Sequence, residues 1–207
     1  MKREDKNQLT RRRIMDSALA EFALHGYGGS SVNNICVGPE ISKGIIYHYF
    51  RTKDELYLAC IEECFQLLTQ HMKAGFQGQG SVEKQLEVYF TLRMEFFHQH
   101  PVYQPIFCEA VISPPVRLTG EIQKRRQEFD ALNVELLQGM LRNLPLRAGI
   151  TEAEVVELFR MFQDFINARC QMPLGDESAF ASRDESCRRA LNVLLYGVIE
   201  RKVDERI

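Results

Sequence analysis

The stretch ISKGIIYHYF, residues 41–50, decides the fold of this chain. Ser42 has a side-chain oxygen that can cap a short helix over the rest of the stretch. Ile41, Ile46 and Phe50 are five and four positions apart, a spacing that turns them inward onto a preceding helix. The sequence therefore predicts a short helix here with one inward apolar face and the other side chains turned outward.

A longer helix is predicted on the N-terminal side of this stretch. Thr10 can cap it, and Ile14, Ala18 and Phe22 form its inner stripe, each four residues from the last. Gly26 is a typical stop signal at its C-terminal end. The helix would have one buried face on which shorter helices can pack.

A second short helix is predicted between these two. Ser30 or Ser31 can cap it, and Val32 and Ile35 supply its apolar side. Pro39 must end it, because proline lacks the N–H donor and clashes with a helical predecessor. Two short helices at a tight turn, preceded by a packing helix, are the pattern of a helix-turn-helix, whose second short helix lies in the major groove of DNA.

The remainder of the chain is also helical in pattern. Thr52 and Glu55 form a capping box that opens a fourth, longer helix toward residue 74, and the glycine-rich stretch 75–81 follows it. Strand-like alternation is hard to find. We expect an all-α chain of about nine helices, with a helix-turn-helix domain in residues 1–52 and a second domain in residues 53–207. The later helical segments are expected near 82–99, 102–112, 117–143, 152–171 and 183–201.

The composition is that of a globular protein with a polar N-terminal end. The chain has 207 residues, of which 45% are hydrophobic, and a net charge of −2. No apolar run approaches the roughly 20 residues that span a bilayer, and no signal peptide precedes the first helix, so we expect a cytoplasmic protein without membrane contact. Lys and Arg crowd the N-terminal quarter. This asymmetry favours a polyanion there, although a solvated charged tail would have the same pattern.

The residues around the two short helices closely resemble the N-terminal signature of the TetR (tetracycline repressor) family of transcriptional regulators. The resemblance covers about residues 10 to 60, and beyond them only length and helix number agree. It implies a homodimeric repressor that holds double-stranded DNA and releases it when a small-molecule effector enters a C-terminal pocket. The residues that carry the resemblance are Gly26-Tyr27, Ser31-Val32, Ile35, the run from Ile41 to Phe50, Lys53 and Leu56.

The turn between the short helices departs from the family. Pro39-Glu40 stand where alanine-glycine is usual, and a non-glycine residue in a left-handed position costs about 1–2 kcal/mol. Gly38 can supply the permissive residue one step earlier. The second short helix is the reading helix, the one that enters the major groove. Because of this departure, the sequence does not determine the tilt of the reading helix.

The outward face of the predicted reading helix supplies the expected DNA contacts. Lys43 can reach guanine or a phosphate, Ile45 can meet a thymine methyl, and Gly44 allows the backbone to approach DNA closely. Tyr47 and His48 resemble phosphate contacts, with partial core packing and a merely solvated ring as their respective alternatives. The expected DNA-binding residues are Arg12, Ser31, Ser42, Lys43, Gly44, Ile45, Tyr47, His48 and Lys53.

Most aromatic residues and methionines follow residue 56, and such residues at helical spacing are more often core than pocket. The resemblance places an inducer among the fourth to eighth helices. The apolar and aromatic residues of these helices imply an apolar or aromatic effector. Arg93, His98 and Gln99 are candidate polar anchors. The expected ligand-binding residues are Phe65, Phe90, Arg93, Met94, Phe97, Phe107 and Phe129.

Two late segments, 152–171 and 187–199, carry apolar residues on more than one face and must be covered twice. They are either buried within one subunit or, as we prefer, paired with their symmetry mates in a four-helix dimer seam. The expected dimer residues are Phe159, Phe162, Leu191, Leu194, Leu195 and Val198.

Other functional classes have weaker signals. HExxH, GxSxG and Walker motifs are missing, so we expect neither an enzyme nor a bound metal or cofactor. The six cysteines show no CxxC pair and are expected to be reduced core thiols. Cys60 and Cys64, with His71 at helical spacing, leave open a thiol- or metal-responsive regulator. A nucleoid-type DNA binder without sequence choice is a further alternative.

Overall fold

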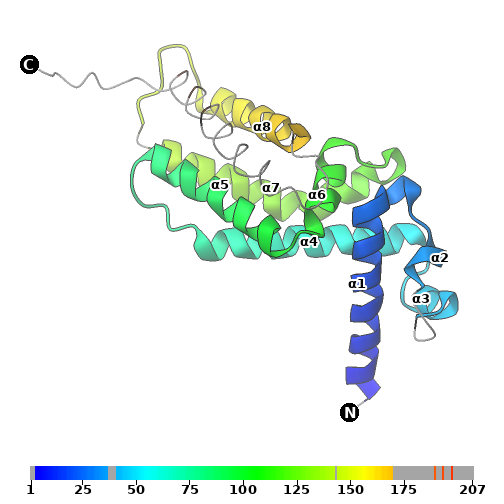
Figure 1. Ribbon diagram of the computed structural model, residues 1–207. Coiled ribbons are helices and arrows are strands. Elements are labelled where there is room, and N and C mark those ends of the chain that lie inside the picture. Colours follow the sequence, from blue (N-terminus) through cyan, green and yellow to red (C-terminus); the bar gives the residue numbers. More distant parts are fainter. Residues whose placement is uncertain are drawn as a thin grey trace, which may run out of the picture.

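The computed structural model describes residues 3–36, 41–142 and 144–169, together with the positions 189, 193 and 197. Every element in these residues is helical, as expected for an all-α chain, and the helix-turn-helix end and the larger helical body occupy opposite ends (Figure 1). The elements are α1 (Arg3–Gly29), α2 (Val32–Ile35), α3 (Lys43–Tyr49), α4 (Lys53–Gly75), α5 (Val82–Gln99), α6 (Tyr103–Ile112), the 3₁₀ turn η1 (Val116–Leu118), α7 (Thr119–Leu141) and α8 (Glu152–Arg169).

Local capping signals set several of these boundaries. The hydroxyls of Ser31, Ser42 and Thr52 each accept a hydrogen bond from the amide three residues later, at 3.2, 3.3 and 3.1 Å. These bonds satisfy amides that a helix N-terminus leaves without partners. The glycine-rich stretch separates α4 from α5, as predicted. The carboxylate of Glu55 accepts from the amide of Arg51 at 2.7 Å, one residue before the position that a capping box uses.

The predicted start of the first helix was wrong. Helix α1 begins at Arg3, and Thr10 lies inside it with its hydroxyl donating to the Lys6 carbonyl at 2.9 Å. The segment before Thr10 holds no proline or glycine, so nothing in it stops helix propagation. At Gly26 the backbone leaves the helical conformation, with φ 63° and ψ 175°, but one more helical turn follows to Gly29.

The core of the N-terminal domain is the predicted one. Ile14, Ala18 and Ile46 are at most 1% exposed, and Phe50 is 3% exposed. The Ser17 hydroxyl donates to the Ile35 carbonyl at 2.8 Å and joins α1 to α2. Helix α2 in turn packs against α3, and Ile46 of α3 lies in the same buried cluster as Ile14 and Ala18 of α1. The orientation of α3 therefore follows that of α1 and α2 together.

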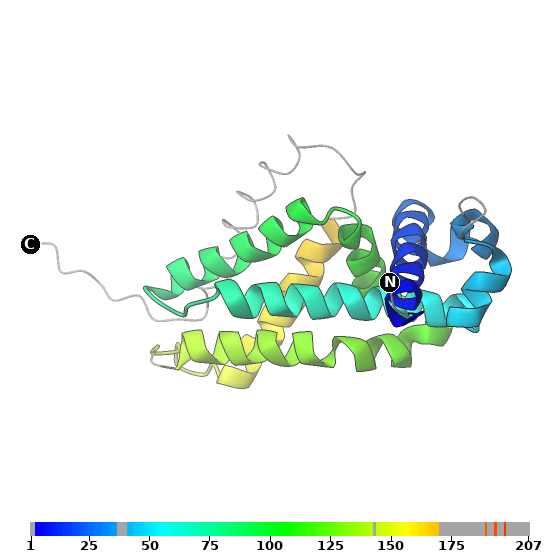
Figure 2. The same ribbon diagram turned by 90° about the horizontal axis from the view of Figure 1, so that it is seen from below.

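The larger body is organised around α4. Figure 2 shows α7 running beside α4 along its length, α5 on another side of it, and α1 crossing it near the helix-turn-helix end. Helix α6 packs against both α1 and α4. No helix among the described residues is long and apolar enough to cross a membrane.

Helix α8 carries two residues of the predicted dimer seam, Phe159 and Phe162. Phe159 is 3% exposed and its ring lies 5.8 Å from that of Tyr89, so its surface is covered within one subunit. Phe162 is half-buried against Phe90, with ring centroids 6.3 Å apart. Among the side chains of this helix that the structure describes, up to residue 163, Leu158 and Met161 are apolar and exposed. Of the predicted seam, Leu191, Leu194, Leu195 and Val198 lie outside the described residues.

We expect Ile46→Ala to unfold the N-terminal domain selectively. Removing a fully buried isoleucine side chain costs about 2–5 kcal/mol, because the cavity left behind does not collapse fully. Leu24, which is 68% exposed on α1, is the control, and Leu24→Ala should change stability by less than about 0.5 kcal/mol. Urea unfolding followed by far-ultraviolet circular dichroism measures both. Equal effects of the two variants would contradict the packing of α3 described above.

Candidate DNA-binding surface and effector core

Helix α3 presents a polar outer face to solvent. Ser42 caps the helix, Ile46 faces inward, and Lys43, Tyr47 and His48 are exposed. Ile45 is half-buried against the core, so only part of its side chain is available to a partner. The exposed side chains of Lys43, Tyr47 and His48 extend from a helix whose orientation is set by the packing of the buried Ile46.

Nothing in the described structure requires glycine at position 44. A Cβ added to Gly44 would meet nothing within 4 Å. Its φ is not positive either, so neither packing nor backbone conformation requires glycine here. The missing side chain leaves the backbone of α3 open to close approach from outside.

The start of α2 already holds a carboxylate. Glu21 on α1 accepts from the Ser31 amide at 3.2 Å and from the Asn34 side chain at 2.9 Å. Glu21 thus places a negative charge from the chain itself at these amides, where a DNA phosphate would also be stabilised. The contact of Ser31 with DNA stays a prediction.

Lys53 and Arg12 are also engaged within the chain. The Lys53 ammonium donates to the carbonyls of Tyr27 at 2.5 Å and Ser30 at 2.7 Å, and lies 4.3 Å from the Tyr27 ring centroid. Arg12 forms ion pairs with Asp16 at 2.5 Å and with Glu63 at 2.7 Å. Both side chains thus stabilise the end or side of α1, and their contact with DNA stays a prediction.

The predicted effector residues gather in the body of the molecule but fill their own space. The ring centroids of Phe65, Phe107 and Phe129 lie 5.4 to 5.8 Å from one another, and Phe97 lies 5.2 Å from Phe107. Phe90 packs instead on Tyr89, and Met94 is half-buried. Of the candidate polar anchors, His98 and Gln99 are exposed, which removes them from this core.

Arg93 is 6% exposed in the middle of this apolar region. Its guanidinium lies 5.4 Å from the Phe107 ring centroid and 5.9 Å from that of Tyr89. Burial raises the pKa of Tyr89, while the charge of Arg93 acts in the opposite direction. A buried guanidinium between aromatic faces is suited to bind an anionic or hydrogen-bond-accepting group.

Sequence reasoning missed the polar residues around Arg93. The Tyr89 hydroxyl donates to Asn133 Oδ1 at 2.7 Å, and the Gln163 amide donates to the Tyr89 oxygen. Elsewhere in the body, Thr69 on α4 is 2% exposed, and its hydroxyl has no hydrogen-bond partner among the described residues. Asn133 was detectable, because it follows Phe129 by four residues on the buried face of a predicted helix.

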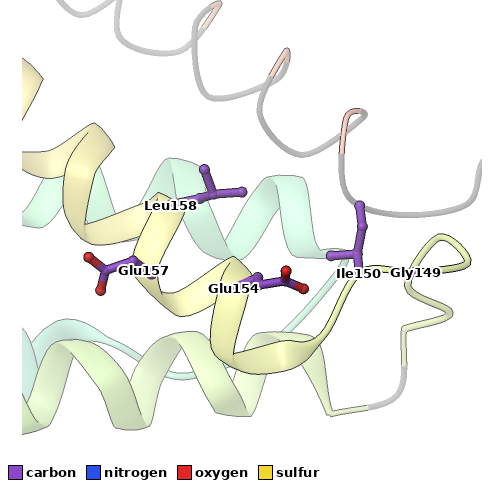
Figure 3. Close-up of a pocket in the computed structure, with 5 residues that line it drawn as sticks. All are labelled: Gly149, Ile150, Glu154, Glu157 and Leu158. Atoms are coloured by element: carbon purple, nitrogen blue, oxygen red, sulfur yellow. The ribbon is translucent and has the colours of Figure 1, made fainter.

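A shallow groove lies where α8 begins (Figure 3). Its volume is about 320 Å³ and it is lined by Gly149, Ile150, Glu154, Glu157 and Leu158. Glu154 accepts from the amide and hydroxyl of Thr151, both at 2.8 Å, and these bonds lower its pKa. None of the predicted effector residues lines this groove, and one of its carboxylates caps its own helix.

The thiol alternative finds no support in the described residues. Cys60 and Cys64 are at most 1% exposed, and burial raises the pKa of both thiols. A reactive cysteine needs the opposite, an exposed thiol with a lowered pKa. No group of histidine, cysteine and acidic residues in the described part of the chain has the geometry of a metal site.

Comparison with known proteins gives a consistent result. Residues 14–60 match the family model described as "Bacterial regulatory proteins, tetR family". The chain is 24% identical over 127 residues to IcaR of Staphylococcus epidermidis, a negative transcriptional regulator of the icaADBC biofilm operon, covering 61% of this chain and 66% of that one. It is 29% identical over 109 residues to the transcriptional regulator UidR of Escherichia coli, covering 53% and 56%. The chain thus matches between about half and two thirds of the length of these relatives.

Solved structures extend the likeness of fold to almost the whole chain. FadR of Bacillus subtilis, solved in complex with stearoyl-CoA, superposes with a TM-score of 0.71 at 15% identity, over 90% of this chain and 98% of that one. An N-terminal helix-turn-helix followed by a helical domain is therefore the architecture of this chain.

We expect Cys60 and Cys64 to be inert in the native protein. Their reaction with a disulfide reagent should be roughly 100-fold slower than in urea, because the thiolate forms only when the core opens. Cys36, which is half-buried, is the internal reference and should react faster. Mass spectrometry of timed labelling measures all three. Native rates for Cys60 or Cys64 close to the unfolded rates would restore the thiol-responsive alternative.

Proposed function

We propose that this chain, a TetR-family transcriptional regulator, acts as a homodimeric repressor that leaves a palindromic DNA operator when a small molecule enters its larger domain. The observation that carries the proposal is the outer face of α3. Lys43, Tyr47 and His48 are exposed there, and no hydrogen bond or ion pair of the chain engages them among the described contacts. A short helix held rigidly from behind, with cationic and hydrogen-bonding groups in front, fits the major groove.

The residues of this face take separate roles in the proposal. Lys43, at the start of the helix, binds guanine O6 and N7 or a phosphate, and Gly44 lets the backbone come close. Ile45 offers its exposed part to a thymine methyl, and Ser42 combines capping with a polar contact. Tyr47 and His48 bind phosphates and fix the register without reading sequence.

We further propose a functional division at residue 52, with DNA binding in residues 1–52 and effector binding and dimerisation in residues 53–207. The start of α4 at Lys53 supports this boundary. Helix α8 contributes to the dimer seam through Leu158 and Met161, which are 39% and 60% exposed. Large apolar side chains on a helix at this exposure are suited to pairing with a second subunit.

The effector has an apolar or aromatic body and an anionic group in this proposal. The aromatic cluster of Phe65, Phe107 and Phe129 supplies the apolar surface, and Arg93 supplies the cation. Thr69 on α4 offers a buried hydroxyl that no described residue binds. The stearoyl-CoA found in Bacillus subtilis FadR combines an aliphatic chain with anionic groups, which supports this class of molecule.

The effector acts by moving α4. This helix begins at Lys53, directly after the DNA-binding domain, and carries Phe65 into the aromatic cluster, so a ligand that separates the cluster displaces α4. The two reading helices of a dimer must lie about 34 Å apart to engage successive major grooves. A displacement of a few ångströms at each helix therefore lowers affinity for the operator.

We expect Lys43→Ala and Tyr47→Ala to weaken operator binding without destabilising the fold. Loss of one good base contact costs about 1–3 kcal/mol, or roughly 5- to 150-fold in affinity, whereas loss of a phosphate contact weakens binding to all sequences. Fluorescence anisotropy on duplexes selected from a random pool measures affinity, and thermal denaturation measures folding. Leu24→Ala is the matched exposed control.

The same selection tests the competing function. A specific regulator should bind its selected palindrome at least about 10³-fold more tightly than random duplex, while a nucleoid-type protein would not. Selection without a palindrome, or unfolding of both variants, contradicts the proposed repressor.

We expect amphipathic carboxylates to stabilise the protein more than their neutral amides. Decanoate against decanamide, and 4-phenylbutyrate against its amide, are suitable pairs, since only the anions can form an ion pair with Arg93. A ligand at 100 times its Kd raises the free energy of unfolding by about 2.7 kcal/mol. Thermal shift on wild type and on Arg93→Gln measures the effect, which should vanish in the variant. Equal stabilisation by the amides would show that Arg93 recognises no anion.

A further inference from the structure

The break in α1 leaves a backbone amide without an acceptor in its own helix, and a side chain of α6 accepts its hydrogen bond. At Gly26 the backbone turns out of the helix, so the Tyr27 amide becomes the first donor of a new helical turn. Glu109 on α6 accepts from this amide with both carboxylate oxygens, at 2.9 and 3.0 Å. The Tyr57 hydroxyl on α4 donates to the same carboxylate at 2.7 Å. We call this set of contacts the Glu109 bridge.

Gly26 itself is part of the Glu109 bridge. A Cβ at this position would lie 3.0 Å from Glu109 Oε1, and the φ of 63° is one that residues with side chains rarely adopt. The glycine therefore allows both the break in α1 and the close approach of α6. Lys53, bound to the Tyr27 carbonyl at 2.5 Å, adds a cation beside the carboxylate.

A second carboxylate joins the same three helices some distance away. Glu63 on α4 forms an ion pair with Arg12 on α1 at 2.7 Å, and the Tyr103 hydroxyl at the start of α6 donates to its other oxygen. The Glu63 side chain is only 20% exposed, so solvent screens this pair incompletely. We call these contacts the Glu63 bridge. In each bridge the carboxylate of one helix binds donors from the other two.

The two bridges hold α6 at two points along its length. Tyr103 and Glu109 are six residues apart, which is about 9 Å along a helix axis. Attachment at one point would allow α6 to pivot against α1, whereas two points oppose both rotation and sliding. The orientation of α1, and hence of α3, follows that of α6.

Helix α6 also reaches into the aromatic core. Phe107, two residues before Glu109, lies 5.4 Å from Phe65 and 5.8 Å from Phe129 between ring centroids. Movement of this cluster must therefore move α6, because a packed interior transmits displacement and does not absorb it. A single helix of ten residues contacts both the effector core and the DNA-binding domain.

We propose that Glu63 and Glu109 are positioning residues that lock the DNA-binding domain to α6, so that the spacing of the two reading helices is set through α1 as well as through α4. The inference rests on the proposed dimeric repressor and names the contacts that govern it. Breaking either bridge leaves α3 folded but lets the domain pivot. Simultaneous engagement of two half-sites then suffers, while a single half-site is read as before.

The test compares a full operator with half of it. Glu109→Gln and Tyr103→Phe each weaken one bridge, and Glu62→Gln is the matched control, a neighbouring glutamate on α4 whose contacts are with Gln66 and Arg125. Affinity is measured by anisotropy for the selected palindrome and for a duplex with one half-site. The two bridge variants should lose at least about tenfold on the palindrome and less than about twofold on the half-site, and the control should match wild type on both.

Two results would overturn the inference: unchanged affinity of both bridge variants for the palindrome, or equal losses on palindrome and half-site. Hydrogen exchange of the peptide that contains Tyr27 checks that Glu109→Gln has broken its bridge, and circular dichroism checks folding. If Glu109→Gln fails to fold, Tyr103→Phe, which removes one hydroxyl at the other bridge, decides the question. A wild-type protein that selects no palindrome would refute the proposed function itself, before any variant is measured.

Discussion

The arrangement of this molecule depends on the hydrogen bond between the Tyr27 amide of α1 and the Glu109 carboxylate of α6. A helix that breaks inside a packed structure leaves a donor that must find an acceptor, since an unsatisfied buried amide costs about 1–3 kcal/mol. Meeting that demand from α6 joins α1, against which the helix-turn-helix packs, to the larger body. Burial raises the pKa of Glu109, while the Tyr57 hydroxyl and the Lys53 charge favour its ionised form.

Two basic side chains of the N-terminal quarter form their contacts within the chain. Lys53 binds two backbone carbonyls, and Arg12 binds two carboxylates. Glu21 meanwhile supplies the anion at the start of α2. Lys53 and Arg12 therefore stabilise the position of α1, and the recognition that we propose rests on the outward face of α3. A count of basic residues alone would overstate the electrostatic attraction of this domain for DNA.

The larger body combines close packing with several buried polar groups. Among the described residues, five polar or charged side chains are buried, and four of them, Thr69, Arg93, Asn133 and Gln163, lie in this body. Such groups weaken a core relative to an apolar one of equal volume, because their desolvation offsets part of the packing energy. Opening such a core requires less free energy, which suits the ligand site that we propose among these side chains.

The amino-acid sequence by itself determined the helical class, the caps at Ser42 and Thr52, the glycine-rich joint, and the inward face of α3, because each of these signals acts over a few neighbouring residues. It left Ser30 and Ser31 as alternatives for the cap of α2, which the structure assigns to Ser31. The start of α1 was missed, since capping potential at Thr10 is not realised when the preceding residues also favour a helix. Only the tertiary structure decided which charges face outward and how α6 holds α1. The partners in the pairs Arg12–Glu63 and Tyr27–Glu109 are 51 and 82 residues apart, and no local pattern encodes which helices come to lie side by side.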